Sequence, residues 1–152
     1  MMTTAPNILI VEARFYPHIS NALLDGAMAA LERAGAHFER VGVPGALEIP
    51  PAILIAARAG EDTGRTHDGY IALGCVIRGD TYHFEIVAGQ SARGLMDLAL
   101  QHGCCIGNGI LTCDTEEQAI ARAARDAQDK GGDAARACLA LMELRARMGS
   151  RV

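Results

Sequence analysis

The stretch "RTHDGYIALGCVI", residues 65–77, decides the fold, because its second half is almost entirely apolar. A strand without polar alternation is expected to be buried on both faces, which is typical of a parallel sheet covered by helices. A similar run, "NILIVEA" (7–13), lies near the N-terminus. The sequence therefore predicts a sheet that is buried between two layers of helices.

Strands and helices alternate along the rest of the chain. Alternating residues and turn signals predict strands over 37–45 and 104–113. Apolar residues at helical spacing predict helices over 18–35, 49–60, 80–103, 114–128 and 130–149. This alternation is typical of the α/β class. We predict a single domain over 1–152, a three-layer α/β/α sandwich with a four-stranded parallel sheet in the order 2134.

Composition excludes several classes of protein. The net charge of -4 and the lack of a basic block argue against nucleic acid as a partner. No apolar run reaches the roughly 18 residues of a membrane span, and the first residues do not resemble a secretory signal. The five cysteines lack CxxC spacing, so we expect free thiols in a reducing cytoplasm: Cys75, Cys104, Cys105, Cys113 and Cys138.

The loop "VIRGDTYH" (76–83) is the richest in reactive groups. In parallel sheets ligands bind beyond the carboxyl ends of the strands, where this loop lies. Asp80 and Thr81 can cap the following helix, whose free N–H groups would favour a phosphate. His83 falls in the first helical turn, where an imidazole could act as a base. The alternative is an ordinary capped helix with a surface histidine.

The other strand-end loops carry weaker signals. The backbone of "VPGALEIP" (43–50) could bind the edge of a planar heterocycle, but the segment could also be a plain turn. Phe15 could stack on a ring or belong to the core. Arg122 and Arg125 would share a helix face, as a phosphate site or as a solvated surface. The metal motif HExxH and the nucleotide motifs GxGxxG and GxxxxGK[ST] are absent.

Taken together, the loops resemble one family. "ARFYPHISNALLDGA" (13–27), "VPGALEIP" (43–50), "LGCVIRGDTYHFE" (73–85), "NGILTCDTEEQA" (108–119) and "DKGGDAA" (129–135) follow the order and spacing of 6,7-dimethyl-8-ribityllumazine synthases. The resemblance covers nearly the whole chain. It implies a transferase of riboflavin biosynthesis that condenses 5-amino-6-(D-ribitylamino)uracil with 3,4-dihydroxy-2-butanone 4-phosphate. The products would be the lumazine, phosphate and water, with no metal or organic cofactor.

The resemblance also assigns roles to positions of this chain. It implies that His83 shuttles protons and that Arg122 binds the phosphate from the adjacent subunit. Phe15 would stack on the pyrimidine, and Glu48 would contact the ribityl chain. The substrate-binding positions that it implies are Phe15, Ala46, Leu47, Glu48, Cys75, Val76, Ile77, Gly79, Asp80, Thr81, Asn108 and Lys130.

Three positions depart from the family pattern. Asn108 stands where many members carry a phenylalanine that stacks from the neighbouring subunit, Asp126 replaces a lysine, and Leu47 replaces a common phenylalanine. Two alternatives follow: a lumazine- or flavin-binding paralogue with little turnover, and a purely structural cage-forming protein. The resemblance further implies a homopentamer with sites at subunit interfaces, which in some members assembles into decamers or 60-mers.

Overall fold

The computed structural model describes residues 4–149 and contains one parallel sheet. Its four strands are hydrogen-bonded in the order β2-β1-β3-β4, with every neighbouring pair parallel. The predicted class, sheet type and strand order are therefore confirmed. The strands are β1 (Asn7–Ala13), β2 (His37–Val43), β3 (Gly69–Ile77) and β4 (Ile106–Cys113).

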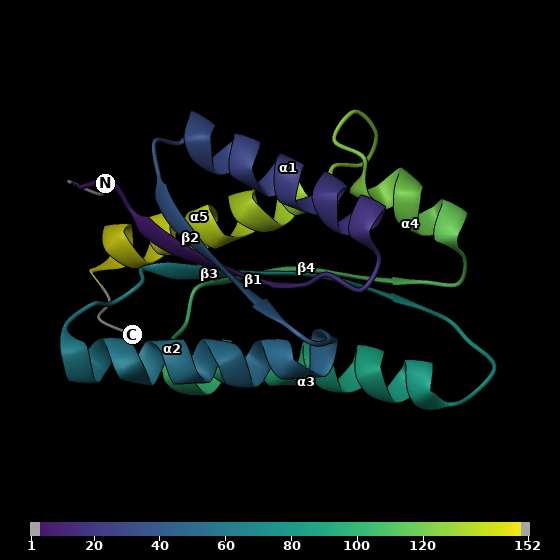
Figure 1. Cartoon of the computed structure of the whole chain (residues 1–152). Coiled ribbons are helices and arrows are strands. Elements are labelled where there is room, and N and C mark those ends of the chain that lie inside the picture. The colour runs from purple at the N-terminus through teal and green to yellow at the C-terminus, as the bar shows by residue number, and fades with distance from the viewer. Residues whose placement is uncertain (1–3, 150–152) are drawn as a thin grey trace.

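Helices cover both faces of the sheet (Figure 1). One layer consists of α2 (Ile49–Thr63) and α3 (His83–His102), and the other of α1 (Pro17–Arg33), α4 (Glu116–Ala123) and α5 (Lys130–Met148). Among residues 4–149, no helix is both long and apolar enough to cross a membrane.

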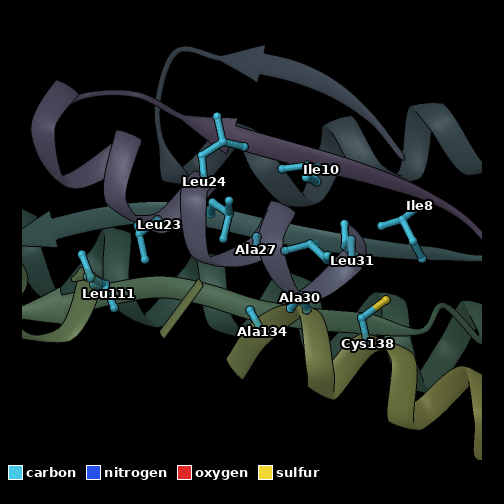
Figure 2. Packing of buried hydrophobic residues seen from close by; sticks show 14 of the residues in the cluster. Ile8, Ile10, Leu23, Leu24, Ala27, Ala30, Leu31, Leu111, Ala134 and Cys138 are labelled. Atoms are coloured by element: carbon cyan, nitrogen blue, oxygen red, sulfur yellow. The ribbon is translucent and has the colours of Figure 1, made fainter. Parts of the chain in front are cut away.

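Two apolar cores lie on either side of the sheet, and β1 contributes to both. Ile8 and Ile10 pack with α1 and α5 (Figure 2), whereas Leu9 and Val11 pack with α2 and α3. This explains why "NILIVEA" has no polar alternation. The edge strand β2 is mostly exposed, because helices and neighbouring strands cover the centre of the sheet better than its margin.

Helix α5 is seated directly on backbone. A Cβ atom at Gly107 of β4 would lie 1.8 Å from the carbonyl oxygen of Ala134, and one at Gly131 would lie 2.0 Å from that of Leu23 in α1. No side chain fits at either position without moving the helix. The two glycines therefore bring α5 into close contact with both β4 and α1.

The prediction of one helix over 114–128 is wrong. Helix α4 ends at Ala123, and a turn leads to Asp129, which adopts a left-handed conformation (φ 48°). The Asp129 carboxylate then accepts a hydrogen bond from the N–H of Gly132, at 3.3 Å, and starts α5. Consequently Arg125 does not share a helix face with Arg122, and it pairs instead with Asp25 at 3.6 Å.

Two smaller expectations also change. Helix α3 begins at His83 rather than at 80, so Asp80 does not cap it, although the Thr81 hydroxyl accepts a hydrogen bond from the His83 N–H at 3.4 Å. A short 3₁₀ helix over Ala46–Glu48 precedes α2 and was not predicted. A hydrogen bond from the Glu48 N–H to the carbonyl oxygen of Gly45, at 3.1 Å, closes this tight turn before the helix.

Replacing Thr115 by alanine should destabilise the protein by about 1 kcal/mol, because this residue caps the helix that carries Arg122. The Thr115 hydroxyl accepts from the N–H of Gln118 at 3.2 Å, and the Gln118 side chain accepts from the N–H of Asp114 at 2.8 Å. Urea unfolding at fixed protein concentration measures the change. Thr115→Ser keeps the oxygen and should retain the parent midpoint. Equal midpoints for the alanine variant and the parent would contradict the capping role.

Candidate active site

A cavity of about 280 Å³ lies at the carboxyl ends of β1, β2 and β3. Parallel strands end at the same edge of a sheet, so their C-terminal loops converge there. Eight residues predicted for the site line this cavity: Phe15, Ala46, Leu47, Glu48, Cys75, Val76, Ile77 and His83. Four different segments of the chain thus meet around one space.

The loop after β1 presents an aromatic pair. The Phe15 side chain is 71% exposed, so it is not a core residue. Its ring meets the ring of Tyr16 edge to face, with centroids 5.0 Å apart and an interplanar angle of 65°. Tyr16 is half-buried against the core and supports Phe15 from behind. An exposed ring on a supported loop is suited to stacking on a planar ligand.

The 3₁₀ turn over Ala46–Glu48 forms a second wall. Ala46 and the following Ile49 are buried and fix the turn to the core, whereas Glu48 is exposed. A Cβ atom at Gly45 would lie 3.1 Å from a carboxylate oxygen of Glu48, so this side chain folds back over the glycine. The turn leaves backbone polar groups and one carboxylate at the cavity.

The end of β3 forms the floor. Burial raises the pKa of the Cys75 thiol to about 12, with smaller contributions from Cys113 and Glu116. The thiol therefore stays protonated at neutral pH and is a poor nucleophile, since thiolate is the reactive form. The chemistry that Cys75, Val76 and Ile77 can offer is hydrogen bonding by the backbone together with apolar contact.

Arg78 holds the loop between β3 and α3. Its guanidinium donates to Asp114 at 2.8 Å and to Glu85, and it lies 4.4 Å from the centroid of the Phe84 ring. The hydrogen bond from Arg78 is the main cause that lowers the pKa of Glu85. Because Arg78 is engaged on three sides, it fixes the start of α3, where His83 lies at the cavity.

Gly79, Asp80 and Thr81 lie in the same loop, beside His83, and all three are exposed. They do not line the cavity of the single chain. A Cβ atom at Gly79 would meet nothing within 4 Å, so the space beside this glycine is open. The segment is free to meet a ligand that extends out of the cavity.

Three predicted residues lie elsewhere on the chain. Arg122 in α4 donates to the carbonyl oxygen of Gln118 at 3.1 Å, and Lys130 pairs with Asp133 at 3.3 Å. The Asn108 side chain accepts a hydrogen bond from the N–H of Ile110 at 2.9 Å. None of the three lines the 280 Å³ cavity within one chain.

Four lining residues were not predicted: Ala13, Tyr16, Gly45 and Val87. Tyr16 follows Phe15 directly, and Val87 lies four residues after His83, hence on the same face of α3. Spacing alone could have found both of them.

The chain is thus an α/β protein with a cavity at the carboxyl end of a parallel sheet. The family description 6,7-dimethyl-8-ribityllumazine synthase matches residues 5–146. The chain belongs to this family, as expected from its loops. It is accordingly an enzyme, a transferase of riboflavin biosynthesis.

Named relatives agree with this assignment. The chain is 57% identical over 144 residues to 6,7-dimethyl-8-ribityllumazine synthase 1 of Rhizobium meliloti (strain 1021), covering 95% of this chain and 94% of that protein. It is 60% identical over 144 residues to the 6,7-dimethyl-8-ribityllumazine synthase of Methylocella silvestris (strain DSM 15510 / CIP 108128 / LMG 27833 / NCIMB 13906 / BL2), covering 95% and 88%. Such coverage leaves no large part of either relative unmatched.

Proposed function

We propose that this chain performs the family condensation in the cavity at the sheet end. 5-Amino-6-(D-ribitylamino)uracil and 3,4-dihydroxy-2-butanone 4-phosphate would join to give the lumazine, phosphate and water. The observation that carries the proposal is the convergence of Phe15, the turn 46–48, the strand end 75–77 and His83 on one space of about 280 Å³. The pyrimidine ring of the first substrate would lie in this cavity, with the polar ribityl chain extending outward.

The pyrimidine substrate is assigned to the inner part of the cavity. Phe15 stacks on the ring, and the backbone of Cys75, Val76 and Ile77 pairs with its polar edge. Ala46 and Leu47 line the site, and Glu48 accepts hydrogen bonds from the ribityl hydroxyls. The support is geometric: the exposed Phe15 ring, the end of β3 and the exposed residue Glu48 all line the same cavity.

The phosphorylated substrate is assigned to the start of α3. Backbone N–H groups of Gly79 and Asp80, with the Thr81 hydroxyl, would bind the phosphate at a helix N-terminus. The other half of this phosphate-binding site comes from a neighbouring copy, which contributes Arg122, with Lys130 close by. The Asp80 carboxylate must point away from the anion, because like charges would repel.

His83 is assigned the proton transfers. The 5-amino group of the pyrimidine attacks the ketone, and loss of water gives an imine. Removal of the proton from the hydroxyl-bearing carbon expels the phosphate and leaves an enol, which takes up a proton at its terminal carbon and becomes a ketone. The ribityl-bearing nitrogen attacks this ketone, and loss of a second water closes the ring. Acid–base assistance is typically worth about 10²–10⁴-fold. Positioning two substrates together supplies a further large share.

The direct test mixes the purified protein with both substrates and follows the lumazine absorbance. Steady formation of lumazine and equimolar phosphate is the expected result. Tight binding of lumazine without turnover would instead favour the binding paralogue suggested by Asn108 and Asp126. Neither binding nor turnover would favour a structural protein on the same fold.

We also propose that the chain forms a homopentamer with its sites at the interfaces. An apolar groove of about 560 Å³ lies between α3, β4 and α5, on the side of the sheet where β4 is the edge strand. Leu100 and Met148 line it with 76% and 72% exposure, and Asn108 lies in it as well. The occupant is a second copy, because the phosphate assignment needs the neighbour's Arg122. Head-to-tail contacts of this kind form a ring when the rotation between neighbouring copies closes.

Replacing Leu100 by alanine should weaken this association about tenfold, because an exposed leucine that becomes buried contributes roughly 1.5 kcal/mol. Alanine keeps the helix propensity of α3. Sedimentation velocity over a dilution series measures the midpoint of dissociation. Gln101→Ala, a neighbouring exposed position outside the groove lining, serves as the matched control. If both variants dissociate like the parent, the groove is not the interface.

The cytoplasm is the proposed compartment. The support is that all five cysteines are free thiols, as expected for a reducing environment.

A further inference from the structure

Glu12 is an unusual residue for its place in the fold. Among residues 4–149 it is the one charged residue that is buried, with 3% of its surface exposed. It lies near the end of β1, directly before Ala13, which lines the active-site cavity. Because side chains alternate along a strand, Glu12 points to the opposite face of the sheet from Ala13. Glu12 is not among the residues that line this cavity.

Two guanidinium groups hold this carboxylate. One oxygen accepts from Arg14 at 2.8 Å, and the other accepts from Arg40 at 2.9 Å and 2.8 Å. Both oxygens are thus occupied by charged donors, the arrangement that a buried carboxylate needs. Filling this strand position would not itself require a charge, since apolar residues of similar volume commonly replace buried ion pairs without loss of stability.

The two arginines differ in what they connect. Arg14 lies in the loop that carries Phe15 and Tyr16, and its second nitrogen donates to the side chain of Asn21 in α1. Glu12, Arg14 and Asn21 therefore span the aromatic loop from the strand before it to the helix after it. Arg40 lies in β2, the strand that pairs with β1, so its contact with Glu12 joins two strands and does not involve the aromatic loop.

We propose that Glu12 is a positioning residue, which orients Phe15 for the pyrimidine substrate by anchoring Arg14 across the aromatic loop. The proposal rests on the proposed function of the cavity. Phe15 is 71% exposed and gains little from the core, so the orientation of its ring depends on the loop backbone and on the adjacent ring of Tyr16 in the same loop. A loop fixed before binding avoids the entropy cost of ordering it with the ligand.

The two arms of the carboxylate allow a matched test. Arg14→Met and Arg40→Met each remove one guanidinium from Glu12, but only the first releases the loop. Arg14→Met and Glu12→Gln should raise KM for the aminouracil about five- to tenfold, with kcat and the KM of the butanone phosphate nearly unchanged. Arg40→Met should change both KM values by less than about twofold. The dissociation constant of the lumazine should follow the aminouracil KM.

Further variants separate positioning from stability. Asn21 is exposed, so Asn21→Ala should fold normally and still raise the aminouracil KM, by about two- to threefold. The effects of Glu12→Gln and Arg14→Met should not add in the double variant, because they break the same contact. Urea midpoints of all variants show whether a change in KM follows lost stability.

Equal KM changes in the Arg14 and Arg40 variants, or parent-like KM values in the Arg14 and Asn21 variants, would overturn the proposal while the active parent still supports the proposed function. A parent that neither forms nor binds lumazine would overturn both.

Discussion

Replacing His83 by alanine should lower kcat for lumazine formation by about 100-fold, the lower part of the range for loss of a general acid–base group. The side chain reaches the cavity from the first residue of α3, and only its backbone N–H contacts Thr81. Among residues 4–149 the His83 side chain forms no hydrogen bond or ion pair, so the truncation removes the imidazole without breaking one. Stopped-flow absorbance with both substrates saturating measures the change.

His102→Ala is the matched control, because this exposed histidine ends the same helix. It should retain the parent rate. Sedimentation should give the parent assembly for both variants, since neither residue lines the apolar groove. Full kcat in the His83 variant would show that another group transfers the protons, and the assignment of the imidazole would then be wrong.

Replacing Arg122 by alanine should lower kcat/KM for the butanone phosphate by about 30- to 150-fold, because a charge-assisted contact with a phosphate contributes roughly 2–3 kcal/mol. The KM of the aminouracil should change little. Among residues 4–149 Arg122 makes one hydrogen bond, to the carbonyl of Gln118, so within that part of the chain most of its donors remain available for a ligand of the neighbour. Steady-state kinetics with each substrate varied in turn measures both values.

The unphosphorylated butanone sharpens this test. If Arg122 binds the phosphate, the alanine variant and the parent should use the unphosphorylated compound equally poorly. Arg125→Ala, whose guanidinium pairs with Asp25 in the turn after α4, serves as the control. An equal loss with both butanones would place Arg122 in the structural support of α4 instead.

Mixing the two inactive variants tests the shared site. A hybrid interface between an Arg122→Ala chain, which keeps His83, and a His83→Ala chain, which keeps Arg122, contains both groups. Random mixing should restore activity at about a quarter of the interfaces. No recovery after subunit exchange would indicate that both residues act within one chain.

Much of the fold follows from local patterns in the sequence. The run 7–13 matches the bounds of β1, because a central strand of a parallel sheet is apolar on both faces. The end of α4 at Ala123 was not predictable from local pattern, because the residues that follow, including Arg125 and Asp126, contain no glycine or proline that would end a helix. There the chain turns because α5 must meet α1 at Gly131, a contact between segments about a hundred residues apart in sequence.

The site divides in the same way. Phe15, Glu48 and His83 follow strand ends, so the general rule for parallel sheets locates them beforehand. The burial of Glu12 between two guanidinium groups could not be predicted, because Arg40 lies 28 residues away and only strand pairing brings the two residues together. In the proposed arrangement Arg122 acts from a second chain, and the structure of one chain does not bring it to the cavity.

Because Arg122 lies away from the cavity of its own chain, the number of complete active sites depends on whether the protomers form a closed ring. In the proposed arrangement a lone protomer owns two incomplete halves and no working centre. In an open row of protomers one half-site at each end has no partner, whereas in a closed ring every half-site is paired. Closing the circle therefore adds one complete centre without adding any protein.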